Sequence, residues 1–79
     1  MEQKTVLIAD DHPMVRRALK SAFNNHPVIR VVGEANDGRE LLELLESVRA
    51  DIAIIDLEMP NQNGYDTIMV CHTKYPDMK

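Results

Sequence analysis

Short apolar runs alternate along the chain with longer segments whose apolar residues recur at helical spacing. The runs at 5–9 (TVLIA) and 52–55 (IAII) do not alternate with polar residues, which is typical of parallel strands buried on both faces. The 52–55 run is the most apolar segment and is expected to be a central strand. Between these two runs, a further strand is predicted at 28–34, the second along the chain, where Arg30 breaks the apolar pattern and favours an edge position.

A helix is predicted after each of these strands. The first begins at His12 and Pro13, because proline suits the first helical position, and it ends before Pro27. Its apolar face is expected to consist of Met14, Val15, Ala18, Leu19, Ala22 and Phe23. The residues expected to face outward are Arg16, Arg17 and Lys20.

The other two helices follow the same logic. The second begins after Asp37, which can cap it together with Glu40 three residues later. Its buried stripe is expected to be Leu41, Leu44, Leu45 and Val48. The third is predicted over about 65–75 and is terminated by Pro76. One side of it carries Tyr65, Ile68, Met69 and His72, and we expect His72 to be a partly buried packing residue.

The order of these elements predicts the topology. Strand, helix, strand, helix, strand, helix with short connections is typical of a parallel sheet built from right-handed crossovers. We expect the strand order 2-1-3, which places the two most apolar strands side by side and the Arg30 strand at an edge. In such sheets ligands bind at the carboxyl ends of the strands where the winding reverses, here between the first and third strands.

Composition limits the class of protein. Seventy-nine residues form one small domain, and no apolar run exceeds four residues, so neither a membrane helix nor a secretion signal is predicted. The net charge is -4 and the basic residues are scattered, which argues against nucleic-acid binding by this segment. The single cysteine, Cys71, is expected to be a buried thiol in a reducing compartment, the cytoplasm.

Three carboxylates follow the predicted strands at the expected ligand-binding edge. Asp10 and Asp11 end the first strand and Asp56 ends the third. At about 5 Å and an effective dielectric near 20, each ionised pair repels by about 3 kcal/mol. A hard divalent cation such as Mg²⁺ relieves that repulsion and leaves room for a phosphate. The alternative is that these aspartates only end strands and cap helices.

Phosphoryl chemistry is the reaction class that this pattern favours. A carboxylate can be the nucleophile that forms an acyl phosphate, and a metal neutralises charge on the incoming phosphoryl oxygens. Asp56, alone at the tip of its strand and followed by a loop, is best placed for attack. His12 follows the acidic pair and could sense or assist phosphoryl transfer, but we expect it instead to cap the helix or to lie at the surface.

Three segments together resemble a known family. They are ADDHPMVRRAL at 9–19, GEANDGRELLELL at 33–45 and DIAIIDLEMPNQNGYD at 51–66. In combination they are similar to the receiver domain of two-component response regulators, most of all the NarL/FixJ-like subgroup, and the resemblance covers the whole chain. It implies a flavodoxin-like receiver fold truncated to three βα units, so that residues 1–79 are expected to be a partial receiver domain without strands four and five or an output domain.

The resemblance also implies residue roles. Asp56 would be the phospho-acceptor and a metal ligand, and Asp11 a direct Mg²⁺ ligand. Asp10 would act on the metal largely through water, and Glu58 would bind it through its backbone carbonyl. Gly64 would supply a turn that bulkier residues would strain. The family's Ser or Thr after strand four and its Lys after strand five are not among these residues, so labelling of Asp56 in the isolated chain is expected to be weak or absent.

The partners implied are those of a signalling module that is not itself an enzyme. A sensor histidine kinase or a small acyl phosphate would donate the phosphoryl group. Contact with DNA, and control of transcription, would come only through an output domain. The strand at 52–55 would expose one apolar edge in a truncated sheet, which predicts self-association through that edge.

Two other functions remain open. A haloacid-dehalogenase-like phosphatase also uses an aspartate nucleophile and Mg²⁺, although that class expects Asp-x-Asp, whereas Asp10 and Asp11 are adjacent. An incomplete domain that pairs with other receivers and performs no chemistry is the second alternative.

Overall fold

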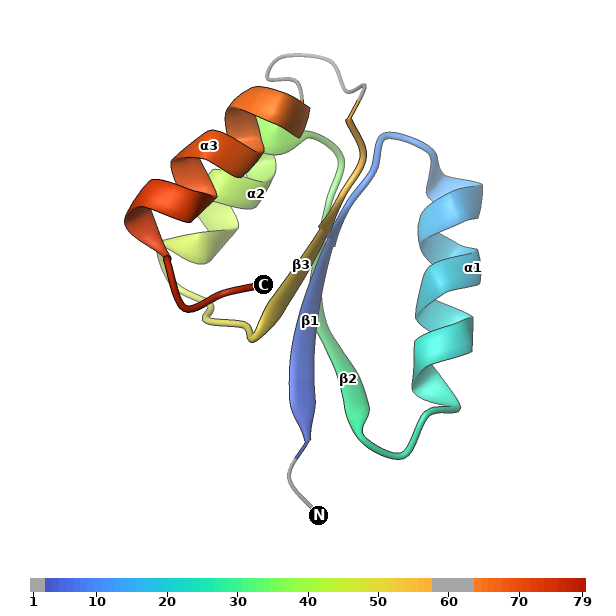
Figure 1. Cartoon of the computed structure of the whole chain (residues 1–79). Helices are drawn as coiled ribbons and strands as arrows, with labels where there is room; N and C mark the ends of the chain where they lie inside the picture. Colours follow the sequence, from blue (N-terminus) through green and yellow to red (C-terminus); the bar gives the residue numbers. More distant parts are fainter. Residues whose placement is uncertain (1–2, 58–63) are drawn as a thin grey trace.

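The computed structural model describes residues 3–57 and 64–79, which form one parallel sheet with helices on both faces. The elements are β1 (Lys4–Ala9), α1 (Pro13–Asn24), β2 (Ile29–Ala35), α2 (Gly38–Leu45), β3 (Ile52–Ile55) and α3 (Gly64–Lys74). The strand order is β2-β1-β3, with α1 on one face and α2 and α3 on the other (Figure 1). The predicted three βα units and the order 2-1-3 are confirmed.

The centre of the sheet is β1. All four residues of its apolar end, from Val6 to Ala9, are buried. Leu7 and Ala9 point to the α2 side, where they form the core with Leu41 and Leu45. The prediction that the strand at 52–55 is covered on both faces is wrong, because β3 is half-buried along its whole length. Its place at the end of the described sheet is the one that the order 2-1-3 predicted.

One extra residue in β2 changes which side chains meet α1. The register with β1 shifts after Val31, so that Leu7 lies beside Gly33 and Ile8 beside Glu34. This is a β-bulge at the edge of the sheet. Because neighbouring residues on paired strands point to the same face, the shift directs Glu34 toward α1.

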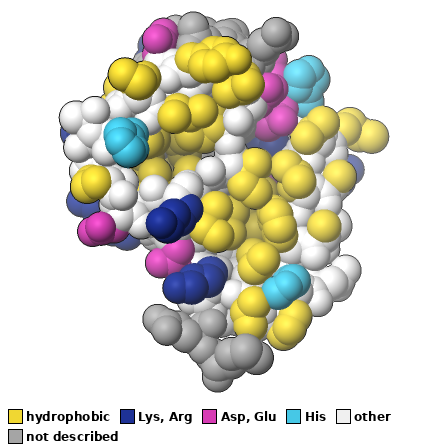
Figure 2. Space-filling view, in the orientation of Figure 1, with side chains coloured by type: hydrophobic (Ala, Val, Ile, Leu, Met, Phe, Trp, Pro, Cys, Tyr) yellow, Lys and Arg dark blue, Asp and Glu magenta, His cyan; other side chains and the backbone are white. Residues whose placement is uncertain are grey.

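Helix α1 is less buried than its pattern predicted. None of its residues is fully buried, and Met14 and Val15 are 78% and 43% exposed. The physical reason is that α1 is the only described helix on its side of the sheet and packs mainly on β2. Hydrophobic side chains therefore remain visible at the surface between the sheet and α1 (Figure 2).

The predicted outward direction of the basic residues on α1 is wrong in one case. Arg17 and Lys20 are exposed, as expected. The side chain of Arg16 is only 16% exposed and turns in toward the end of β1, where it donates a hydrogen bond to the backbone carbonyl of Asp10.

Helix α2 forms as its sequence predicts. The Asp37 carboxylate accepts a hydrogen bond from the backbone N–H of Glu40 at 2.8 Å, which satisfies one of the free donors of the first turn. Leu41 and Leu45 are buried, and Leu44 and Val48 pack against the core.

Helix α3 buries a different side from the one predicted. Its buried residues are Gly64, Thr67 and Cys71, whereas Tyr65 and Met69 are 65% and 69% exposed. Ile68 and His72 are exposed as well. Small side chains let α3 lie close to α2 and β3, the elements it contacts. Cys71 is buried as predicted, and burial raises the pKa of its thiol.

The last residues of the chain return to the open edge of β3. The Lys79 backbone N–H donates to the Asp51 carbonyl at 2.8 Å, and the Ala53 N–H donates to the Lys79 carbonyl at 3.3 Å. The C-terminus accordingly lies beside β3 (Figure 1). None of the helices in the described ranges is both long enough and apolar enough to cross a membrane.

Gly64 is required by a close approach of backbone. A Cβ atom at this position would lie 2.2 Å from the Asp56 carbonyl oxygen and 2.4 Å from the Leu57 Cα. The Gly64 N–H also donates to the Leu57 carbonyl at 3.0 Å. The start of α3 is therefore packed directly onto the chain that leaves β3.

We predict that Gly64→Ala lowers the free energy of unfolding by about 1–3 kcal/mol, because backbone must move to admit the methyl group. The matched control is Gly33→Ala, whose Cβ would first meet side-chain methyls of Leu7 and Leu44, at 2.8 and 2.9 Å. Those methyls can shift, so the loss should be smaller. Urea unfolding of both variants measures the difference, and equal losses would contradict this explanation.

Candidate functional site

The carboxyl ends of β1 and β3 lie level with each other. Ala9 is paired with Ile55 at the last position of the ladder, and the Asp56 N–H donates to the Ala9 carbonyl at 2.9 Å. Asp10 and Asp11 follow directly after Ala9. The strand pairing thus brings the three predicted carboxylates to one edge of the sheet.

The three aspartates form a compact cluster together with His12. One ligand atom from each of Asp10, Asp11, His12 and Asp56 lies within 4.8 Å of all the others. The carboxylate side chains are 13%, 31% and 25% exposed for Asp10, Asp11 and Asp56. They are therefore partly shielded from water, which strengthens their mutual repulsion above its value in bulk solvent. We call this group the acidic cluster.

His12 lies at the surface, as one of its two expected roles required, with its side chain 63% exposed, and it also joins the acidic cluster. Its side chain makes no capping bond to α1. Its Nδ1 instead lies 2.9 Å from carboxylate oxygens of both Asp10 and Asp11, and 3.8 Å from one of Asp56. The hydrogen bond with Asp10, and then the charge of Asp11, raise the pKa of His12. The only sequence signal was its position next to the acidic pair.

Hydrogen bonds within the loop occupy Asp10 but not Asp11. One carboxylate oxygen of Asp10 accepts from the His12 backbone N–H at 2.8 Å and pairs with the imidazole as well. The Oδ1 of Asp11 is shielded from solvent and accepts no hydrogen bond from the described part of the chain. A single imidazole N–H cannot point at both carboxylates. Although His12 lies close to Asp11, the Oδ1 atom of Asp11 is therefore left without a hydrogen bond from it.

The donor set fits a hard cation. Carboxylate oxygens are the ligands that Mg²⁺ prefers, and it commonly takes one or two of them while keeping waters. The oxygen of Asp11 that accepts no hydrogen bond from the described residues lies 2.9 Å from His12 Nδ1, and Asp11 belongs to this donor set. Glu58, the fourth predicted ligand, lies outside the described residues.

An acid at the opposite end of the sheet shows what a purely structural aspartate looks like. One carboxylate oxygen of Asp51 lies 2.9 Å from the Thr5 backbone N–H and 3.2 Å from the Thr5 hydroxyl, both of which donate to it. These bonds lower the pKa of Asp51. The acidic cluster differs because its carboxylates face one another.

Comparisons with known proteins identify relatives. The sequence model of the family described as response regulator receiver domain matches residues 6–79. The chain is 45% identical over 67 residues to the nitrate/nitrite response regulator protein NarL of Escherichia coli, covering 85% of this chain and 31% of that protein. It is 42% identical over 71 residues to a protein-glutamate methylesterase/protein-glutamine glutaminase of Pyrococcus abyssi, covering 90% of this chain and 19% of that protein.

A solved structure agrees with these sequences. The isolated REC domain of RcsB from Salmonella enterica serovar Typhimurium, determined in the presence of the phosphomimetic BeF3-, matches with a TM-score of 0.92 and 30% identity, covering 99% of this chain and 59% of that one. The expected flavodoxin-like receiver fold and the likeness to NarL-type receivers are confirmed. The chain spans less than a third of the length of the two curated relatives.

We predict that Asp10→Asn lowers the pKa of His12, because the hydrogen bond with Asp10 is the largest cause of its elevation. The imidazole is charged in the folded state to a higher pH than in the unfolded state. Its stabilising contribution is thus complete below about pH 6.5, the unfolded value, and is lost as the pH rises through the folded pKa.

Proton NMR titration of His12 measures this shift. The matched control is Glu43→Gln, which changes an exposed carboxylate on α2 that pairs with Arg39 and lies outside the acidic cluster. We expect that control to leave the His12 titration unchanged. An unaltered titration in Asp10→Asn would contradict the geometry of the cluster.

Proposed function

The chain belongs to the response regulator receiver domain family, and we propose that it is the phospho-accepting part of a two-component response regulator, with Asp56 as the acceptor. The observation that carries the proposal is the acidic cluster, in which atoms of Asp10, Asp11 and Asp56 lie within 4.8 Å of one another at the carboxyl ends of β1 and β3. This is the edge at which sheets of this class bind ligands.

Asp56 has the features of a nucleophile. Its carboxylate stands at the end of β3 and is 25% exposed, so a phosphoryl donor can reach it. One of its oxygens forms the new bond to phosphorus while the bond between phosphorus and the donor breaks. The leaving group is a histidine nitrogen when a sensor kinase is the donor, and a carboxylate when an acyl phosphate is the donor.

We propose Mg²⁺ as the cofactor, with Asp11 and Asp56 as direct ligands. Asp11 suits direct ligation because its Oδ1 lacks a hydrogen bond. Asp10 suits an indirect role through water, since His12 already occupies one of its oxygens. Glu58 would contribute its backbone carbonyl. When bound, the metal supplies the positive charge that the incoming phosphoryl oxygens require.

A signalling role fits the chain better than an enzymatic one. The Pyrococcus abyssi relative is named for a methylesterase activity, but the similarity covers only 19% of that protein. The adjacent Asp10 and Asp11 also depart from the Asp-x-Asp pattern of haloacid-dehalogenase-like phosphatases. We propose that the module works in the cytoplasm and controls transcription through a DNA-binding domain outside these residues, in keeping with its likeness to NarL.

We also propose that the chain self-associates through the open edge of β3. The backbone N–H of Asp56 donates to β1. Successive residues of a strand direct their backbone N–H and C=O groups to opposite sides, so those of Ala53 and Ile55 point away from β1. Lys79 pairs with Ala53 but not with Ile55 in the described chain. Beside this edge lies a groove of about 440 Å³, lined in part by Ile68 and Met78. Unpaired backbone next to apolar surface favours pairing with a second copy.

The acceptor is tested by incubating the protein with acetyl phosphate and Mg²⁺ and mapping the product by mass spectrometry. We expect one phosphoryl group on Asp56 in a small fraction of the molecules. It should be lost in Asp56→Asn and when Mg²⁺ is removed, and retained in Asp77→Asn, which changes an exposed carboxylate near the C-terminus.

Other outcomes of that experiment favour the competing functions. Steady hydrolysis of phosphate esters would support a phosphatase. Binding of Mg²⁺ without any adduct would support an interaction module without chemistry. A phosphoryl group on a different residue would contradict the assignment of Asp56.

Self-association is tested by analytical ultracentrifugation over a range of concentrations. We expect the apparent mass of the wild-type chain to rise with concentration. Ala53→Lys should keep it monomeric, because a charge beside an edge strand opposes pairing. Ser21→Lys adds the same charge at an exposed position of α1 and should behave as wild type. A wild-type chain that stays monomeric at high concentration would contradict the proposal.

A further inference from the structure

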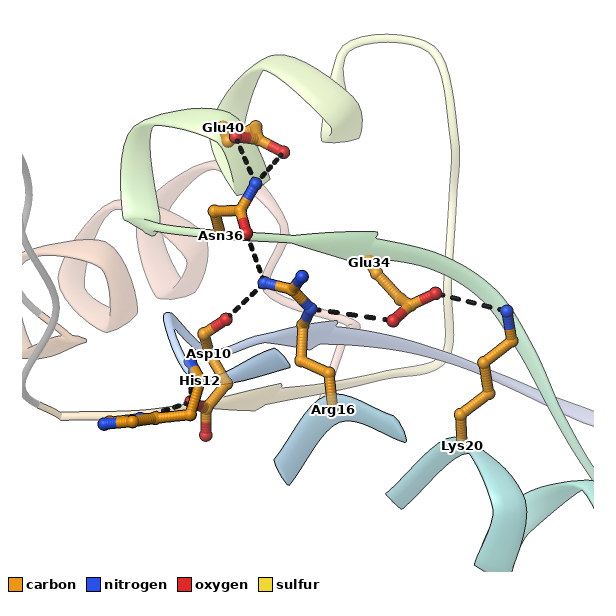
Figure 3. Close-up of polar contacts among 7 residues, drawn as sticks. All are labelled: Asp10, His12, Arg16, Lys20, Glu34, Asn36 and Glu40. Carbon is orange, nitrogen blue, oxygen red and sulfur yellow. Dashed lines mark hydrogen bonds and ion pairs between the residues drawn. The ribbon is translucent and has the colours of Figure 1, made fainter. Parts of the chain in front are cut away.

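The loop that carries Asp10 and Asp11 is held by a side chain from α1. Arg16 lies in the first turns of that helix, and its backbone N–H donates to the His12 carbonyl at 3.1 Å. Its guanidinium reaches back to the end of β1, where Nη1 donates a hydrogen bond of 2.7 Å to the Asp10 carbonyl (Figure 3). The contact is shielded, since the Arg16 side chain is only 16% exposed.

The Asp10 backbone is consequently fixed on both sides. Its N–H donates to the Ala35 carbonyl of β2 at 3.1 Å, and its carbonyl accepts from Arg16. The carbonyl belongs to the peptide that joins Asp10 to Asp11, so its orientation sets the direction in which both carboxylates leave the backbone. Without the Arg16 side chain, the hydrogen bond to the Asp10 carbonyl is lost and only the one from the Asp10 N–H remains.

The guanidinium is itself held in place by β2 and the segment after it. Nη1 also donates to the Asn36 side-chain oxygen, and Nε lies 3.6 Å from a carboxylate oxygen of Glu34. Asn36 in turn donates to both carboxylate oxygens of Glu40 in the first turn of α2, at 3.4 Å each. Figure 3 shows this chain of contacts running from the loop after β1 to α2.

We infer that Arg16 is a positioning residue for the metal-binding carboxylates, acting through the Asp10 backbone and not by contact with the ion. The inference rests on the proposed function, because it assigns Mg²⁺ to the acidic cluster. Groups that orient metal ligands from outside typically change metal affinity by about 10-fold to 100-fold when they are removed. Arginine suits the task because its planar guanidinium bonds the Asp10 carbonyl and Asn36 through Nη1 while its Nε, which makes no hydrogen bond in the described part of the chain, faces the Glu34 carboxylate at 3.6 Å.

The sign of the effect separates positioning from simple electrostatics. A cation near the cluster repels Mg²⁺, so removing its charge would tighten binding if charge alone mattered. A positioning role predicts the opposite result, namely weaker Mg²⁺ binding after Arg16 is replaced. Arg16→Lys sharpens the distinction, because it keeps the charge but replaces the planar fork by a single point of attachment.

The test measures the Kd of Mg²⁺ alone by NMR titration of the wild-type chain and its variants, under conditions in which each is folded. We expect Arg16→Met and Arg16→Lys each to weaken binding by roughly 10-fold. Hydrogen exchange at the Asp11 and His12 amides should become faster in both variants without metal. The matched control is Lys20→Met, which removes the other cation on Glu34 and leaves the bond to Asp10 intact.

The outcomes distinguish this inference from the proposed function. Absence of Mg²⁺ binding by the wild-type chain would contradict the proposed function itself. Wild-type binding with unchanged affinity in both Arg16 variants, or tighter binding in Arg16→Met, would overturn the positioning role alone. An equal loss in Lys20→Met would overturn it too, because that result would reflect the ion pair with Glu34. A lower unfolding midpoint with unchanged Kd would show a merely structural residue and would also overturn it.

Discussion

Mutual repulsion of carboxylates at the ends of two paired strands is the constraint on which the rest of the structure depends. Parallel pairing of β1 with β3 leaves Asp10, Asp11 and Asp56 at one edge, and atoms of all three lie within 4.8 Å of one another. At such distances each ionised pair costs about 3 kcal/mol at an effective dielectric near 20. Positive charge relieves this repulsion, and the imidazole of His12, whose pKa the hydrogen bond with Asp10 raises, lies 2.9 Å from carboxylate oxygens of both Asp10 and Asp11.

The two faces of the sheet are held by different kinds of interaction. On the α2 side, buried leucines form a continuous core with β1. On the α1 side no helical residue is fully buried, so polar contacts carry more of the attachment, through Arg16 to the Asp10 carbonyl and through Lys20 to Glu34. The exposed Lys20 pair contributes about 0–1 kcal/mol at most. The contacts that attach α1 are in part those that hold the acidic loop, so the two features are coupled.

The sequence correctly predicted the features that depend on residues close together along the chain. The unbroken apolar run before Asp10 indicated a buried strand, and Asp37 indicated the start of α2. It failed for α3, where apolar residues surround the helix and the small residues Thr67 and Cys71 pack inward. It also failed for Arg16, because Glu34 and Asn36, two of the groups it faces, are distant in sequence and a bulge in β2 turns Glu34 toward α1. No periodicity within a single helix contains that information.

The most direct measurement of the central claim is paramagnetic broadening of the amide NMR spectrum by Mn²⁺, which favours the same oxygen ligands as Mg²⁺. Substoichiometric Mn²⁺ should selectively broaden the amides around Asp10, Asp11 and Asp56, and excess Mg²⁺ should restore them. Signals around Asp51, at the opposite end of the sheet, should remain sharp. Broadening centred on Asp51, or none at the ends of β1 and β3, would contradict the account.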